Sequence, residues 1–161
     1  MFKAEIHTEE LDDFIKDLTE DLKSVKGAKA GWFEGKKYPD RETKGEKKIS
    51  GIEIAKNALI QEYGTDKIPS RPFMRLTIAK NQEKWKKLIE EFYDPEGDGL
   101  NLESVMDKIG GEMAGDMKRS IGSNIPPPNS PITVKRKRGS TRTLMDTGLL
   151  RQSIHWEVIK K

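Results

Sequence analysis

The chain has 161 residues, of which 35% are charged and 34% hydrophobic, and its formal net charge is +3 at pH 7. This length is typical of one domain with a modest core. The absence of cysteine excludes disulfides, thiol nucleophiles and cysteine-ligated metal sites. Without a signal-peptide-like start or an apolar run of roughly 20 residues, we expect a soluble, unexported protein with no membrane partner.

The positive charge is concentrated in the C-terminal quarter. From residue 125 onward there are eight Lys and Arg against two acidic residues, so this part carries +6 and the first 124 residues carry −3. Such an excess can neutralise DNA phosphates or bind an acidic protein, and it is equally compatible with a solvated loop. The residues available for such a contact are Lys135, Arg136, Lys137, Arg138 and Arg142.

The first part of the chain predicts a helix, a strand and a charged loop. Thr8 can cap a helix that ends near Gly27 and carries an apolar stripe. A short strand follows over residues 28–34, in which Trp32 and Phe33 face opposite sides, so one of them meets a neighbouring subunit or helix unless both pack in the core. Residues 35–48 lack an apolar period and predict a mobile loop, which either orders on assembly or stays solvated. The stripe consists of Leu11, Phe14, Ile15, Leu18 and Leu22.

A second helix is predicted to begin at a capping box formed by Ser50 and Glu53 and to end at Tyr63. Gly64 follows at the position where a left-handed closing residue favours glycine. The residues at helical spacing that predict its buried face are Ile52, Ala55, Leu59 and Tyr63.

Two prolines stiffen the junction with the next helix. Pro69 and Pro72 keep Ser70 and Arg71 extended, because a residue before proline is pushed out of the helical region. A third helix then runs over residues 73–93, with Ile78, Trp85, Leu88, Ile89 and Phe92 on one face, and the acidic stretch 94–99 ends it as a turn between helices.

The arginines of this junction are candidates for subunit contacts. Arg71 is held away from the backbone between two prolines, and Arg75 lies in a first helical turn, where a cation is unfavourable without a partner. We hypothesise that both bind carboxylates or carbonyls of an adjacent subunit. The alternative is an intrachain bond to Glu62 or Asp66.

Asn101 is a plausible cap for a fourth helix, which contains three interior glycines. Each glycine costs about 1 kcal/mol relative to alanine in a helix interior. Close approach of another helix would offset this cost at Gly110, Gly111 and Gly115, and a kink is the alternative. The predicted buried face consists of Leu102, Val105, Ile109, Met113, Met117 and Ile121.

Residues 125–143 predict a Pro-rich and basic extended segment, interrupted by a short helix that Ser130 and Pro131 begin and that ends near Arg136. Asp146 can then cap a single helical turn before a strand over residues 154–159, which would pair with the strand at 28–34. The whole chain thus predicts one α+β domain over 1–161, with four main helices packed on a small, mostly antiparallel sheet and with long charged and Pro-rich loops.

Catalytic patterns are weak. Asp146-Thr-Gly148 is the triplet with which retroviral-type aspartic proteases present a carboxylate, but only 13 residues follow Gly148, too few to complete a substrate cleft. His7 and His155 have no acid spaced for metal ligation or a relay, and no glycine-rich phosphate cradle is present. We therefore predict no enzyme activity, no cofactor and no metal site.

Three stretches resemble one known family. Glu62-Tyr-Gly-Thr65 with Ile68-Pro-Ser-Arg-Pro-Phe-Met-Arg75, Pro127-Pro-Asn-Ser-Pro-Ile-Thr133, and Leu144-Met-Asp-Thr-Gly-Leu-Leu-Arg-Gln-Ser-Ile154 occur in the order seen in that family. They are similar to the signatures of tailed-phage tail-completion and virion morphogenesis proteins related to the lambda minor tail protein Z group.

This resemblance implies a structural subunit of a phage tail or neck. The expected role is a ring, by resemblance a hexamer, that completes the head-proximal end of the tail and helps to join it to the head. The expected partners are further copies of the chain, the tail terminator, the tail tube and the connector, with genomic DNA passing through the ring; the expected location is the virion, after assembly in the host cytoplasm. Interface candidates on the motif residues and the strand are Trp32, Tyr63, Gly64, Thr65, Arg71, Pro72, Phe73, Arg75, Pro127, Asn129, Ser130, Asp146, Thr147 and Gly148.

Two alternatives remain open at this point. A DNA-binding accessory protein would use the basic residues 135–142, and a tail-terminator or head-connector ring protein would differ from a tail-completion protein in its partners rather than in visible chemistry.

Overall fold

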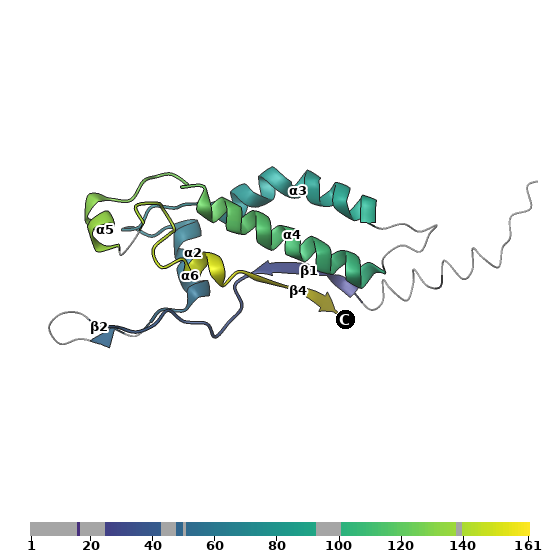
Figure 1. The fold of residues 1–161 in the computed structure, drawn as a ribbon, viewed down its shortest axis with the longest axis horizontal. Helices are drawn as coiled ribbons and strands as arrows, with labels where there is room; N and C mark the ends of the chain where they lie inside the picture. Colours follow the sequence, from purple (N-terminus) through teal and green to yellow (C-terminus); the bar gives the residue numbers. More distant parts are fainter. Residues whose placement is uncertain (1–15, 17–24, 43–47, 50, 93–100, 138–139) are drawn as a thin grey trace, which may run out of the picture.

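The computed structural model describes residues 16, 25–42, 48–49, 51–92, 101–137 and 140–161. In order, the elements are β1 (Val25–Gly31), β2 (Arg41–Glu42), β3 (Lys48–Ile49), α2 (Ile54–Tyr63), α3 (Phe73–Phe92), α4 (Leu102–Gly122), α5 (Pro131–Arg136), α6 (Leu149–Gln152) and β4 (His155–Lys160). Helix and sheet are mixed, as predicted. Figure 1 shows α3 and α4 side by side, the β1–β4 ribbon along α4, and α2, α5 and α6 gathered at one end.

Helix α4 is the central element of the fold. It contacts α3, β1, β4 and α6, and the side chain of Asn101 caps its start by accepting a hydrogen bond from the backbone N–H of Ser104 at 2.9 Å. The predicted cap is therefore confirmed. Of the predicted buried face, Val105, Ile109, Met117 and Ile121 are buried, whereas Leu102 and Met113 are partly exposed.

Strands β1 and β4 form an antiparallel ribbon in which Ala28 pairs with Val158 and Gly31 with His155. This pairing was predicted, but β1 begins at Val25 and ends at Gly31, earlier than the predicted strand. Residues 25–27 belong to the strand and not to the end of the first predicted helix. The rest of that helix, apart from Lys16, lies outside the described residues.

The predicted approach of another helix to the α4 glycines is wrong at Gly110, because the group that approaches there is a side chain of strand β4. The ring of Trp156 from β4 lies so close to Gly110 that a Cβ there would come within 2.6 Å of its Cδ1. The neighbouring Gly111 would place a Cβ at ordinary contact distance, 3.7 Å, from the same ring. At Gly115 only the Arg119 side chain lies within 4 Å, so close packing does not explain that glycine.

The main core lies where α2, α3, α4, α6 and β4 meet. Phe73 is fully buried at its centre, and Trp32 packs edge-on against it with ring centroids 5.5 Å apart. The Trp32 indole also donates a hydrogen bond to the carbonyl of Leu150 at 2.8 Å. The buried core residues are Ile54, Ala58, Phe73, Ala114, Met117, Ile121, Ile125, Leu150 and Ile154.

The predicted buried face of the second helix is wrong. Leu59 and Tyr63 are 58% and 63% exposed, and Ile52 precedes the helix and is 40% exposed. The buried face of α2 instead consists of Ile54, Ala58 and Glu62. The reason is that Glu62 must face inward to reach the start of α3, which turns the apolar stripe outward. Similarly, Ile78 of α3 is 47% exposed.

The predicted capping box at the start of α2 is also wrong. The helix begins at Ile54, and Glu53 precedes it without a side-chain capping bond; Ser50 lies outside the described residues. The predicted loop over 35–48 contains β2, which pairs with β3 in an antiparallel hairpin. The backbone N–H of Ile54 donates to the carbonyl of Lys36 at 2.9 Å, so the hairpin stem continues to the first residue of the helix.

The C-terminal elements follow the prediction in part. Helix α5 begins as expected, with the Ser130 side chain accepting from the backbone N–H of Thr133 and with Pro131 at its first position. For α6 the predicted cap is wrong, because Gly148, in a left-handed conformation with φ 80°, precedes the helix, and Asp146 lies two residues earlier.

Candidate functional site

Residues from the three family-like stretches surround one open cavity of about 690 Å³, which we call the motif groove. Its walls come from the hairpin stem before α2, the end of α2 and the turn after it, the Pro-rich segment with α5, and the segment leading into α6. The lining residues are Tyr38, Pro39, Gly51, Ile52, Asn57, Gln61, Lys67, Ile68, Pro69, Arg71, Pro127, Pro128, Asn129, Ser130, Thr133, Lys137, Leu144, Asp146, Thr147, Gly148, Leu149 and Leu150.

The turn between α2 and α3 is set by local hydrogen bonds. Gly64 ends α2 with φ 76°, where a Cβ would lie 2.7 Å from the backbone nitrogen of Ser70. Thr65 and Ile68 exchange backbone hydrogen bonds of 2.8 and 3.2 Å, and the Ser70 hydroxyl donates to the carbonyl of Glu62 at 2.7 Å. The glycine predicted at the end of the helix is thus required both by its backbone angle and by space.

Glu62 caps the following helix from the end of α2. Its buried carboxylate accepts hydrogen bonds from the backbone N–H groups of Met74 (2.8 Å) and Arg75 (3.1 Å) and from Nε of Arg75 (2.9 Å). An anion is favourable at a helix N-terminus. The intrachain alternative is therefore confirmed for Arg75, whose guanidinium also lies 5.0 Å from the centre of the Tyr63 ring.

Arg71 joins the α2–α3 junction to the Pro-rich segment. Its side chain is buried, at 5% exposure. Nε donates to the carbonyl of Pro127 (2.9 Å), Nη2 to that of Pro128 (3.4 Å), and Nη1 to Oε1 of Gln61 (3.3 Å). These acceptors are neutral, and neither Glu62 nor Asp66, the two intrachain partners considered from sequence, binds it. Burial lowers the pKa of Arg71 from its ordinary value.

Lys137 also lines the groove. Its Nζ donates to the carbonyls of Arg142 and Met145 and so ties the end of α5 to the last motif segment. Burial lowers the pKa of Lys137, the charge of Asp146 opposes this, and the charge of Arg71 adds to it. Asn129 supports the same segment by donating to the carbonyls of Thr141 (3.0 Å) and Arg142 (3.1 Å).

The predicted interface candidates fall into three groups. Trp32 and Phe73 pack in the core, Arg71, Pro127, Asn129, Ser130, Asp146, Thr147 and Gly148 line the groove, and Tyr63, Gly64, Thr65, Pro72 and Arg75 belong to the junction beside it. Among the basic residues, Lys135, Arg136 and Arg142 are exposed, Lys137 is partly buried, and Arg138 lies outside the described residues.

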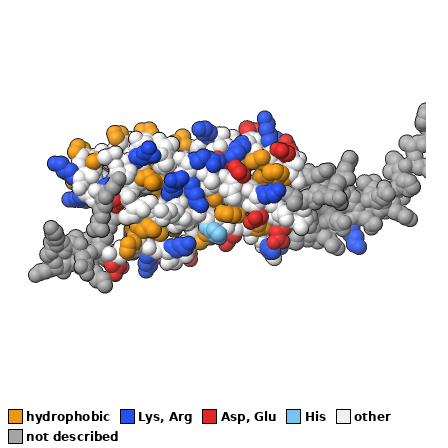
Figure 2. Space-filling view, viewed as in Figure 1, with side chains coloured by type: hydrophobic (Ala, Val, Ile, Leu, Met, Phe, Trp, Pro, Cys, Tyr) orange, Lys and Arg blue, Asp and Glu red, His pale blue; other side chains and the backbone are white. Residues whose placement is uncertain are grey.

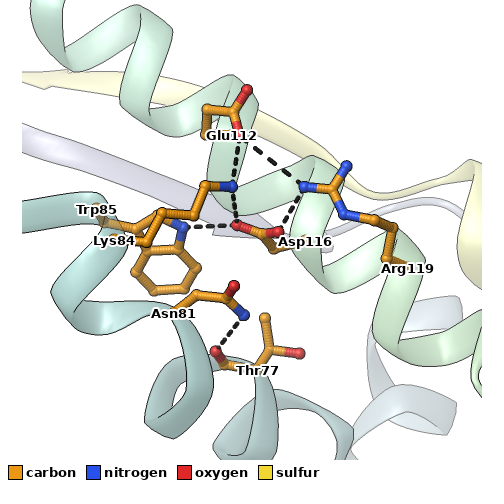
Figure 3. Close-up of polar contacts among 7 residues, drawn as sticks. All are labelled: Thr77, Asn81, Lys84, Trp85, Glu112, Asp116 and Arg119. Carbon is orange, nitrogen blue, oxygen red and sulfur yellow. Dashed lines mark hydrogen bonds and ion pairs between the residues drawn. The ribbon is translucent and has the colours of Figure 1, made fainter. Parts of the chain in front are cut away.

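Sequence reasoning missed two features. The hairpin stem contributes Tyr38 and Gly51 to the groove, and no local pattern signals that approach. The other feature is the Asp116 cluster, formed by Lys84, Trp85, Glu112, Asp116 and Arg119 between α3 and α4 (Figure 3). An acidic residue between the apolar positions of a predicted helix was the only available signal.

The Asp116 cluster links helix α3 to helix α4 through hydrogen bonds and ion pairs. Asp116 is 6% exposed and accepts hydrogen bonds from Trp85 Nε1 (2.8 Å), Lys84 Nζ (3.0 Å) and Arg119 Nη2 (2.5 Å). Burial alone would raise the pKa of Asp116, but these hydrogen bonds and the charge of Lys84 outweigh it, so the pKa is lowered. The buried carboxylate of Asp116 is thus already paired within the chain.

Comparisons with known proteins add no assignment, because no protein-family model, curated protein or solved structure matches this chain. In the described part of the chain, no group of three or more acidic or histidine side chains is placed to hold a metal ion. Of the helices that the structure describes, none is long and apolar enough to cross a membrane.

Proposed function

We propose that this chain is a structural subunit of a tailed-phage virion that forms a ring at the head-proximal end of the tail or in the neck. The observation that carries the proposal is the convergence of three family-like stretches, far apart in the sequence, on the motif groove. The hydrogen bonds of the buried Arg71 hold the α2–α3 junction against the Pro-rich segment. This gives the groove a fixed shape, which favours its use as a contact surface. A ring subunit needs such a surface on a rigid frame.

The outward face of α2 supports self-association in this proposal. Leu59 and Tyr63 lie one helical turn apart and are exposed, and Leu76 at the start of α3 is 49% exposed. Figure 2 shows hydrophobic side chains exposed between Lys and Arg at the end that carries α2 and α5. Exposed apolar side chains of this kind mark subunit interfaces when they are contiguous.

The proposed role is tail completion and head–tail joining, with the tail terminator, tail tube and connector as neighbours and a hexamer as the ring. In the finer architecture that we propose, the N-terminal segment supplies a further main helix on the sheet. A tail-terminator or head-connector role has the same structural requirements and differs in the neighbours that the ring touches.

The mass of the purified protein in solution, measured by light scattering with and without tails that lack it, tests this function. We expect a hexamer, or a monomer that forms a ring only on tails. Leu59→Ser should reduce assembly without loss of folding, whereas Ile78→Ser, a matched change at an exposed α3 position, should not. A monomer that ignores tails would overturn the proposal.

A DNA-binding accessory role is the second candidate, because Lys135 and Arg136 are exposed at the end of α5. Contacts with phosphates would make retention on DNA steeply dependent on salt. Strong, salt-sensitive retention by the isolated protein, lost in a Lys135→Gln and Arg136→Gln double variant, would favour this role over ring formation.

A further inference from the structure

The motif groove contains a buried cation, Arg71, whose hydrogen-bond partners among the described residues are neutral. A guanidinium has five N–H donors, and Arg71 uses three of them on two carbonyls and an amide oxygen. One N–H on each terminal nitrogen therefore has no acceptor in the described part of the chain. No acidic residue that the structure describes forms an ion pair with this side chain. A buried charge of this kind is unfavourable until an anion approaches it.

A second cation faces the same space. Lys137 lines the groove with Arg71. Burial lowers the pKa of Lys137, the charge of Asp146 opposes this, and the charge of Arg71 lowers that pKa further. The full set of charged lining residues is Lys67, Arg71, Lys137 and Asp146. Three cations against one carboxylate leave the groove positive, so its complement carries negative charge.

The remaining walls are shaped for an extended chain. Four prolines line the groove, at positions 39, 69, 127 and 128, together with Ile68, Leu144 and Leu149. Prolines make rigid, apolar walls that lose little conformational entropy when they bind a partner. A cavity of about 690 Å³ is within the size range of specific binding sites, which are mostly apolar with a few placed polar groups.

From these observations we infer that the motif groove binds an extended peptide segment of a partner protein through an aspartate or glutamate side chain, which Arg71 and Lys137 hold together. A carboxylate matches the fork of a guanidinium in two parallel hydrogen bonds. The inference rests on the proposed function only in placing the peptide on a neighbouring virion protein.

Nucleic acid fits the groove less well. Phosphate contacts that give affinity for DNA come from exposed lysines and arginines along a surface, and the exposed cations of α5, Lys135 and Arg136, lie outside the set that lines the groove. A single side chain can enter the groove and bind Arg71 more readily than the backbone of a duplex can.

The test uses the full-length isolated protein and a short capped peptide of alternating proline and glutamate. A peptide with glutamine in place of glutamate is the control, and binding is followed by NMR chemical shifts. We expect shifts at Ile68, Leu144 and Leu149 with the glutamate peptide alone. Lys137→Gln should weaken binding about tenfold, and Lys135→Gln, a matched change outside the groove, should leave it unchanged.

Equal binding of the two peptides, or no binding to protein with a native spectrum, would overturn the inference. Equal weakening by Lys135→Gln and Lys137→Gln would overturn it as well. If duplex DNA displaces the peptide from the groove, the groove is a nucleic-acid site and the peptide inference is overturned. If the protein forms a ring on tails but binds neither peptide, only this inference is overturned. If it binds the glutamate peptide but forms no ring, only the proposed function is overturned.

Discussion

The indole of Trp156 lies against the backbone of Gly110, where a Cβ would come within 2.6 Å of Cδ1. The same ring donates a hydrogen bond from Nε1 to Oδ1 of Asp107 at 3.0 Å, one turn earlier on α4. The contact thus joins the last strand to the central helix at two points. It explains why a residue with poor helix propensity occupies a buried position in the middle of α4.

Gly110→Ala should therefore destabilise the protein. The gain of about 1 kcal/mol in helix propensity is outweighed by a clash with a ring that the hydrogen bond to Asp107 holds in place, and overpacking costs about 1–3 kcal/mol. Urea unfolding measures the difference. Gly115→Ala, where the nearest group is Nη1 of Arg119 at 3.6 Å, is the matched control and should be neutral or stabilising. Equal effects of the two changes would contradict the Trp156 contact.

Glu62→Gln should lower the free energy of unfolding by about 2 kcal/mol, because the carboxylate has three charge-assisted hydrogen bonds at the start of α3. The amide of glutamine has one oxygen acceptor, whereas the carboxylate uses one oxygen for Met74 and the other for Arg75. Thermal or urea unfolding checks this value. Glu90→Gln, at an exposed position of α3, should change stability little, and unchanged stability of the Glu62→Gln variant would argue against the capping role.

Acid should weaken the Asp116 cluster. Because the pKa of Asp116 is lowered in the folded protein below its ordinary value of 3.8, its contribution is complete above that value and is lost as pH falls through the folded pKa. We expect Asp116→Asn to cost about 1–2 kcal/mol at neutral pH, a modest figure because Lys84 and Arg119 are largely exposed. The difference from wild type should shrink below about pH 4. A pH-independent difference would contradict this origin.

Local chemistry explains which parts of the fold were predictable. Asn101, Gly64 and Ser130 with Pro131 mark helix ends correctly, because capping depends on the residue itself and on its near neighbours in the chain. The exposed face of α2 was predicted wrongly because Leu59 and Tyr63 have the helical spacing of a core stripe. Only the distant start of α3, which binds Glu62, decides which side of that helix faces inward.

The motif groove could not be predicted for the same reason: it depends on contacts between distant parts of the chain. The family-like stretches were visible as separate motifs, but their meeting point depends on Arg71 reaching the carbonyls of Pro127 and Pro128, more than fifty residues away. Backbone acceptors carry no sequence signal, so the expectations for Arg71 were a contact with an adjacent subunit or, as the alternative, a bond to Glu62 or Asp66. The hairpin stem joins the site for a similar reason, through the backbone bond between Ile54 and Lys36.

Arg71→Ala should destabilise the isolated subunit by about 2–3 kcal/mol, since it removes three hydrogen bonds from a charged, buried donor and the links that it makes to the Pro-rich segment. Unfolding of the purified chain measures this effect before any assembly takes place. Arg151→Ala, at an exposed position on α6, is the matched control and should change stability by less than about 0.5 kcal/mol. If Arg71→Ala leaves the isolated subunit as stable as wild type and abolishes only ring formation, the guanidinium serves a neighbouring subunit and not the internal link between the motif stretches.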